Sequence, residues 1–198
     1  MTQPLPSLYI ARHGETAWTI TKQHTGLSDI PLTPRGEQNA RALAGRLGGR
    51  TFSYVFTSPS MRARRTCELA GFGAAARVDP DLSEWHYGAY EGLTTQQIRK
   101  ERPDWQLFRD GCPGGESVAE IGARADRVIA RLRATDADVL GFSSGHFSRV
   151  IAARWCGMEP ARGKSFYLDT AALSILGYEN STNDPVVRLW NDTRHVSA

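Results

Sequence analysis

Three residues suited to anion chemistry stand together near the start of the chain. An apolar run at residues 8–11 is followed directly by Arg12, His13 and Gly14. An arginine binds two phosphate oxygens through its planar guanidinium, and a histidine can act near neutral pH as nucleophile, acid or base. A glycine lets a ligand approach the backbone. The tripeptide is compatible with an anion site, although by itself it fits better a strand end with a surface arginine and a turn glycine.

A second basic group occupies the first turn of a predicted helix that starts at residues 58–60. Arg62, Arg64 and Arg65 lie there, where cations oppose the helix dipole by about 0.3–1 kcal/mol each. A bound anion facing Arg62 would remove the conflict. Three solvated arginines are the alternative.

An acidic residue lies within a segment rich in aromatic residues and glycine. Glu84 belongs to residues 82–92, which we expect to form an ordered surface loop of the kind that often carries function. Its carboxyl group could serve as a general acid.

Polar residues also follow a later apolar run. Ser144, Gly145 and His146 lie between a predicted strand at 138–142 and a predicted helix at 147–155. A strand end joined to a helix N-terminus is a natural anion pocket.

These four places together fit phosphoryl transfer through a covalent histidine. His13 would attack phosphorus, while Arg12, Arg62 and helix-end amides would hold the phosphoryl oxygens. Glu84 would protonate the leaving alcohol.

Alternating strands and helices would bring these distant residues together. We expect further strands at 54–56, 171–178 and 186–190, and further helices at 33–47, 58–70, 94–101 and 117–134, with a polar loop at 17–31. The alternation predicts a single domain, residues 1–198, with a three-layer α/β/α sandwich around a mostly parallel central sheet.

Composition narrows the class of protein. The chain has 198 residues, 40% of them hydrophobic, and a net charge of +3. No apolar run approaches the roughly 18 residues of a membrane span, and residues 1–7 lack a secretory pattern. We therefore expect a cytoplasmic protein with no membrane partner. The absence of a dense basic stripe with interleaved aromatics argues against nucleic acid.

The cysteines suggest neither a disulfide framework nor a zinc site. Cys67, Cys112 and Cys156 are odd in number and far apart. We expect them to be reduced and mostly structural.

Four sequence blocks, in order, carry a family resemblance. They are RHGETAW at 12–18, TSP..RARRT at 57–66, L.EW.YG.YEG at 82–92 and GHFSRV at 145–150. The chain resembles the histidine phosphatase superfamily, also called the phosphoglycerate-mutase-like family, over nearly its whole length.

The resemblance implies a phosphoglycerate-mutase-like fold, a phosphohistidine intermediate, and neither metal nor other cofactor. It implies that His13 is the nucleophile and Glu84 the proton donor, with Arg12 and Arg62 binding phosphate. The residues that it places in the substrate pocket are Thr19, Thr25, Gly26 and Tyr87. The implied partner is a small-molecule phosphate ester. A homodimer is compatible with the sequence, which does not settle the oligomeric state.

One position departs from the family pattern. The family's second histidine stands five residues before the arginine at position 149, and here that position holds Ser144. His146 could replace the missing group as a catalytic residue, Ser144 could bind phosphate through its hydroxyl, or the site could be impaired. A lost cationic ligand would cost a few kcal/mol of transition-state stabilisation.

Three functions follow from these readings. The first is a histidine acid phosphatase-type phosphoric monoester hydrolase acting on a sugar phosphate or similar metabolite. The GHFSR block resembles that of sugar-bisphosphate and broad acid phosphatases, and the short segment 93–138 lacks the longer insertion of mutases. The second is a catalytically impaired module that binds a phosphorylated ligand, and the third is a phosphoglycerate-type mutase. His24 lies in a loop that could close over the substrate.

Overall fold

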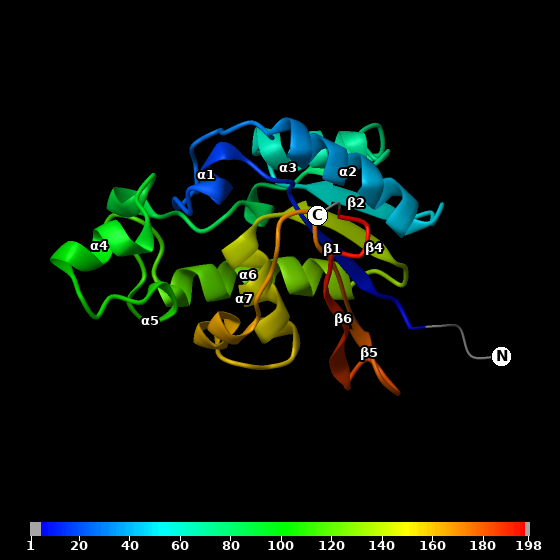
Figure 1. The fold of residues 1–198 in the computed structure, drawn as a ribbon. Coiled ribbons are helices and arrows are strands. Elements are labelled where there is room, and N and C mark those ends of the chain that lie inside the picture. Colours follow the sequence, from blue (N-terminus) through cyan, green and yellow to red (C-terminus); the bar gives the residue numbers. More distant parts are fainter. Residues whose placement is uncertain (1–4, 197–198) are drawn as a thin grey trace.

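A six-stranded sheet forms the centre of the computed structural model, which describes residues 5–196. The strand order is β3-β2-β4-β1-β5-β6 (Figure 1). The strands are β1 (Leu8–Arg12), β2 (Tyr54–Thr57), β3 (Ala76–Val78), β4 (Val139–Ser143), β5 (Leu173–Tyr178) and β6 (Pro185–Asp192). Strands β1 to β4 are parallel to one another, whereas β5 pairs antiparallel with β1 and β6 pairs antiparallel with β5. The mostly parallel sheet that the sequence predicts is confirmed.

Helices cover both faces of this sheet. The α-helices are α1 (Ala17–Ile20), α2 (Pro34–Leu47), α3 (Met61–Leu69), α4 (Thr95–Glu101), α5 (Leu107–Asp110), α6 (Val118–Arg133) and α7 (Gly145–Trp155). Short 3-10 helices are η1 (Pro80–Leu82), η2 (Gly88–Tyr90) and η3 (Pro160–Ser165). In Figure 1, α2 and α3 lie above the sheet and α6 and α7 below it, so the predicted three layers are present.

The alternation of side chains along β1 divides the core into two clusters. Tyr9 and Ala11 pack with Leu43 of α2 on one face, whereas Leu8 and Ile10 belong to the cluster on the other face. The cluster that contains Leu8 and Ile10 also includes the predicted inner face of α6, where Ile121, Ala125, Val128 and Ile129 are buried. Period-2 and period-3.6 patterns thus meet as expected for strands between helices.

Register brings two predicted site segments to one edge of the sheet. Arg12, the last residue of β1, pairs with Ser143, the last residue of β4. His13 and Ser144 therefore leave the sheet side by side, and the His13 amide donates to the Ser143 carbonyl at 3.0 Å. Ligand sites of open α/β sheets lie beyond such carboxyl strand ends.

Three local predictions need correction. The expected loop at 17–31 contains the short helix α1, because Thr16 and Thr19 form a capping box that stabilises a first turn. Segment 82–92 is not a surface loop: Trp85 and Tyr87 are almost fully buried, and the Trp85 indole donates to the Glu116 carbonyl. Helix α7 begins at Gly145, two residues before the predicted start.

The cysteines are free, as predicted, with Cys67 and Cys112 buried and Cys156 half-buried. Burial raises the pKa of the Cys67 and Cys112 thiols to about 12. Within residues 5–196, no helix has both the length and the apolar character that a membrane crossing requires.

Candidate active site

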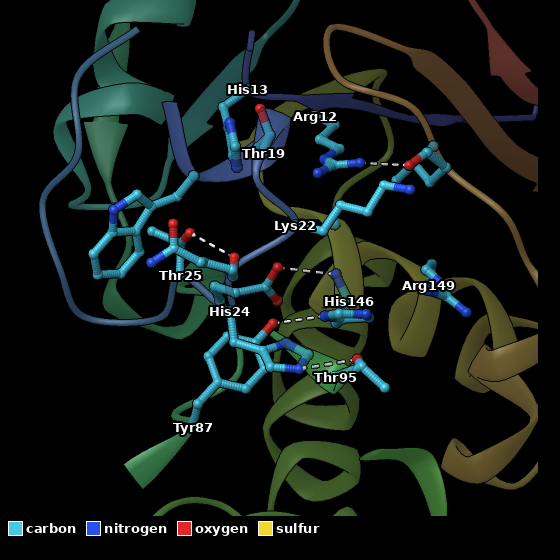
Figure 2. Close-up of a pocket in the computed structure, with 15 residues that line it drawn as sticks. Arg12, His13, Thr19, Lys22, His24, Thr25, Tyr87, Thr95, His146 and Arg149 are labelled. Atoms are coloured by element: carbon cyan, nitrogen blue, oxygen red, sulfur yellow. Dashed lines mark hydrogen bonds between the residues drawn. The ribbon is translucent and has the colours of Figure 1, made fainter. Parts of the chain in front are cut away.

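A cavity of about 280 Å³ opens beyond the ends of β1 and β4 (Figure 2). Seven sequence-predicted residues line it: Arg12, His13, Thr19, Thr25, Glu84, Tyr87 and His146. Arg62 and Ser144 are fully buried behind this lining. Gly26 is buried as well, and its amide donates to the Glu91 carboxylate at 2.8 Å. The volume lies just below the roughly 300–1,000 Å³ of drug-sized sites, which suits a small metabolite.

His13 is held as a neutral imidazole just beyond the carboxyl end of β1. Its Nδ1 lies 2.8 Å from the Gly14 carbonyl oxygen. A carbonyl can only accept, so Nδ1 carries the hydrogen and the lone pair is on Nε2. Burial lowers the pKa of His13 well below its usual value, and the charges of Arg62 and Arg12 lower it further. The ring is therefore an unprotonated nucleophile at neutral pH.

The backbone beside His13 is fixed by close packing. The Gly14 amide donates to the Thr66 hydroxyl of α3 at 3.0 Å. Gly14 also lies against the start of α2, where an added Cβ would stand 2.5 Å from the Gly36 carbonyl oxygen. Only a glycine fits there, so helix α2 locates the turn that presents His13.

Arg12 presents unsatisfied donors at the end of its strand. One Nη1 hydrogen bond reaches the Leu168 carbonyl at 2.5 Å, whereas the buried Nε has no partner among the described residues. The guanidinium lies over the backbone of Gly145, where a Cβ would be 3.1 Å from the Arg12 Cζ. Buried polar groups are normally paired, so this guanidinium is well suited to an anionic ligand.

Arg62 is anchored by the loop that follows α1. Its Nη1 donates to the Ser28 carbonyl, and its Nη2 donates to the Thr25 and Gly26 carbonyls, at 2.8–3.0 Å. The Nε hydrogen is again buried without a described partner. Arg62 therefore orders the loop over the cavity and adds positive potential at His13.

Glu84 is held by the N-terminus of α7. Its Oε1 accepts from the amides of Trp85 and Phe147, and its Oε2 accepts from the amide of His146 at 2.9 Å. A carboxylate at this end of a helix is also favoured by the helix dipole. Glu84 also lines the cavity, so its carboxyl group is available to a bound ligand for proton transfer.

His146 is engaged by neighbouring aromatic residues. Its Nδ1 lies 2.6 Å from the Tyr87 hydroxyl, and its ring centroid lies 5.5 Å from that of Phe108. Burial lowers the pKa of His146 well below its usual value and lowers that of His24 to about 4. Burial raises the pKa of Tyr87 well above its usual value. The cavity thus contains three neutral imidazoles and a protonated phenol.

The Ser144 hydroxyl has no hydrogen-bond partner in the described part of the chain. It is completely buried, and although Ser144 is the N-cap of α7 its side chain does not cap the helix. Ser and Asn-type side chains at such positions normally accept from the first turn, and here the Glu84 carboxylate takes those amides instead.

The sequence analysis did not identify several of the residues that line the cavity. They are Trp18, Lys22, Gln23, Thr95, Arg149 and Leu168. Arg149 follows His146 at helical spacing i,i+3, so the periodicity of α7 could have indicated it. His24, expected only as a loop residue near the substrate, lines the cavity and packs against Tyr87, with the ring centroids 4.7 Å apart. Nothing in the local sequence singles out Lys22.

Over residues 5–196, no three His, Cys, Asp or Glu side chains are grouped to hold a metal ion. The expectation of metal-free chemistry stays a prediction.

Fold and site define an α/β protein whose candidate active site combines a buried neutral histidine, arginines with free donors and one carboxylate at the carboxyl ends of parallel strands. A profile of the histidine phosphatase superfamily (branch 1) matches residues 8–193. The chain therefore belongs to the histidine phosphatase superfamily, and the predicted family and fold are confirmed.

Individual relatives agree with this assignment. An acid phosphatase of Mycobacterium tuberculosis is 42% identical over 185 residues, which cover 91% of this chain and 90% of that protein. The sedoheptulose 1,7-bisphosphatase of Saccharomyces cerevisiae is 39% identical, covering 77% of this chain and 68% of that protein. The solved structure of Rv3214 from Mycobacterium tuberculosis matches with a TM-score of 0.89 at 39% identity, covering 96% of this chain and 99% of that one.

Proposed function

We propose that the chain is a phosphomonoesterase that hydrolyses a small phosphorylated metabolite without a metal, through a phosphohistidine on His13. The observation that carries the proposal is the state of His13: a buried neutral ring with Nδ1 engaged, next to two arginines. The similarity to an acid phosphatase and to a sugar bisphosphatase supports hydrolysis of phosphate esters.

In the first step, Nε2 of His13 attacks phosphorus and forms a P–N bond as the ester P–O bond breaks. The positive charges of Arg12 and Arg62 beside His13 stabilise the charge on the phosphoryl oxygens. Glu84, in its protonated form, gives its proton to the leaving alkoxide.

In the second step, water attacks the phosphohistidine. The Glu84 carboxylate takes a proton from that water as the P–N bond breaks. Inorganic phosphate then departs, and His13 is again a neutral imidazole. Donor and acceptor roles of Glu84 reverse between the two steps, as microscopic reversibility requires for a double displacement. The alcohol part of the substrate would lie against Thr19, Thr25, Gly26 and Tyr87.

Ser144 supplies a neutral hydroxyl where the family pattern has an imidazole. Its unpaired hydroxyl can donate one hydrogen bond to the phosphoryl group, but without the charge of a histidinium. His146 is less suited to fill that place, because its ring is bound to Tyr87 and its amide to Glu84. We therefore assign His146 to substrate positioning beside Glu84.

The test is phosphate release from p-nitrophenyl phosphate in the presence of a chelator. We expect wild-type turnover that is unaffected by the chelator, and a loss of about a thousandfold or more in kcat for His13→Ala. Turnover that requires a metal, or that survives His13→Ala, would refute the proposal.

A second candidate function is supported by Ser144 alone: an impaired member of the fold that binds a phosphorylated ligand without turning it over. Calorimetric titration with inorganic phosphate, together with a panel of phosphate esters, separates the two. Binding with no release of phosphate from any ester would favour the binding module.

A further inference from the structure

Glu84 lies in an irregular connection, residues 83–87, between η1 and η2. Because these residues belong to no helix or strand, no regular ladder pairs their backbone groups. Buried backbone groups nevertheless need hydrogen-bond partners. Two side chains that are not among the lining residues of the cavity, those of Glu116 and Arg124, supply such partners here.

Arg124 of α6 holds the backbone that leads into Glu84. The residue is almost fully buried, with 8% of its surface exposed. Its Nη1 donates to the carbonyls of Asp81 and Ser83 at 2.8 and 2.7 Å, and its Nη2 donates to the carbonyl of Glu84 itself at 3.2 Å. One planar guanidinium thus fixes the direction of the chain at three successive contacts up to the proposed proton donor.

Glu116 holds the backbone on the other side of Glu84. Its Oε2 accepts from the His86 amide at 2.9 Å, and its own amide donates to the His86 carbonyl at 2.8 Å. Its carbonyl accepts from the Trp85 indole at 2.9 Å. An added Cβ on Gly115 would stand 2.1 Å from the same His86 carbonyl oxygen, so the two segments are in direct contact.

These two side chains also bind each other. The Nε and Nη2 of Arg124 donate to the two carboxylate oxygens of Glu116 at 2.7 and 2.6 Å. The pair is bidentate and mostly buried, since the side chains are only 10% and 19% exposed. Glu84 therefore lies between two groups that are locked to one another.

The Arg124 guanidinium further contacts the helix end that binds the Glu84 carboxylate. Its Cζ lies 4.1 Å from the ring centroid of Phe147, and the Phe147 amide donates to Glu84 Oε1 at 2.8 Å. Arg124 thus touches both the backbone of Glu84 and the residue that orients its carboxyl group. Small displacements of a reacting group can cost orders of magnitude in rate, so this contact bears on the chemistry.

We propose that Arg124 and Glu116 are positioning residues that place the Glu84 carboxyl group for proton donation to the leaving alcohol. The inference rests on the proposed function, in which Glu84 is that donor. Neither side chain is among the lining residues of the cavity, so we expect neither to touch the substrate. Their loss should therefore slow the reaction only as far as it depends on proton donation.

The leaving group of the substrate reports on this proton donation. A p-nitrophenolate ion is a weak base that departs without a proton, whereas an alkoxide needs one. The measured quantity is the ratio of kcat/KM for the best substrate in a panel of alkyl phosphates to kcat/KM for p-nitrophenyl phosphate. A loss of folded enzyme lowers both values equally and leaves the ratio unchanged. Hydrolysis of the phosphohistidine follows P–O cleavage and does not enter kcat/KM.

We expect Arg124→Lys to lower this ratio about tenfold or more, because one ammonium cannot make the fork to Glu116 and all three carbonyl contacts. Glu116→Gln keeps an oxygen for the His86 amide and should lower the ratio several-fold, so it decides the question if Arg124→Lys does not fold. The matched control is Arg127→Lys in the same helix, whose side chain is 57% exposed and pairs with Asp81. It should keep the wild-type ratio.

Glu84→Gln separates the inference from the proposed function. We expect it to lower the ratio about a hundredfold or more, because the proton donor itself is lost. If Glu84→Gln has this effect while folded Arg124→Lys and Glu116→Gln keep the wild-type ratio, the positioning role is wrong and the proposed function stands. A wild type that cleaves no alkyl phosphate, or a ratio that Glu84→Gln leaves unchanged, would refute the role of Glu84 and the inference with it.

Discussion

At the scale of single residues, the buried hydroxyl of Ser144 is the feature that most limits the proposed chemistry. The residue directly follows β4, and its hydroxyl has no hydrogen bond with the described residues. An imidazolium at this position would add a charge-assisted hydrogen bond, which is roughly twice as strong as a neutral one.

Whether a substitution of Ser144 raises or lowers kcat therefore depends on the new side chain. We expect Ser144→His to raise kcat about ten- to a hundredfold, because it restores a cationic donor to the phosphoryl group. Ser144→Ala should lower kcat several-fold by removing the hydroxyl. Steady-state kinetics on p-nitrophenyl phosphate, with thermal melting to check folding, would measure both. A correctly folded Ser144→His enzyme that is no faster would mean that another group already fills this role.

At the scale of secondary structure elements, the contact between the turn after β1 and the first turn of α2 positions the nucleophile. A Cβ on Gly36 would stand 2.2 Å from the Glu15 carbonyl oxygen, whereas one on Gly45, in the same helix, would meet nothing within 4 Å. The two glycines form a matched pair that separates steric from helix-propensity effects.

We expect Gly36→Ala to reduce the free energy of unfolding by about 1–3 kcal/mol, because backbone atoms must move apart. It should also lower kcat, since the displaced turn carries His13. Gly45→Ala should instead stabilise the protein by about 0.5–1 kcal/mol through helix propensity and leave kcat unchanged. Urea unfolding and kinetics on both variants test this. Equal effects of the two substitutions would show that the close approach is unimportant.

The sequence was most informative where a local rule determines an element. Thr33 and Pro34 start α2, Ser117 caps α6, and the apolar face of α6 is buried as its spacing predicts. The segment around Glu84 was misplaced because aromatic residues with two glycines fit a surface loop equally well. Its burial depends on a distant partner, the Glu116 carbonyl that accepts from Trp85.

The site residues also divide into those that a local sequence pattern predicts and those whose position depends on the tertiary structure. The two strand-end motifs pointed to Arg12, His13 and His146, and the family resemblance supported the roles of His13 and Glu84. Arg149 could have been indicated by its i,i+3 spacing from His146 in α7. Lys22 enters the cavity through the path of the turn after α1, which no short motif encodes.

At the scale of the whole molecule, neutral buried histidines make stability depend on pH. Burial lowers the pKa of His24 to about 4 from 6.5, and the pKa values of His13 and His146 are lowered as well. Between the unfolded and folded pKa values the unfolded chain binds protons that the native protein does not. The free energy of unfolding therefore falls as the pH drops below about 6.5, and for His24 the decline ends near pH 4.

For His24 alone we expect a loss of about 2 kcal/mol between pH 7 and pH 5. Urea unfolding of the wild type at the two pH values would show a larger loss, because His13 and His146 contribute in the same direction. His24→Gln should reduce the pH dependence, whereas His86→Gln, outside the cavity lining, is the control. A His24→Gln protein with the full wild-type pH dependence would contradict the buried neutral state of this ring.

The covalent role of His13 is tested most directly by trapping the intermediate. The enzyme would be mixed with a phosphate ester labelled with radioactive phosphorus, quenched in alkali within milliseconds, and digested for peptide mapping. We predict an alkali-stable, acid-labile label on the peptide that contains His13, present in the wild type and absent from His13→Asn. Phosphate release by a wild-type enzyme that never acquires this label would contradict the account.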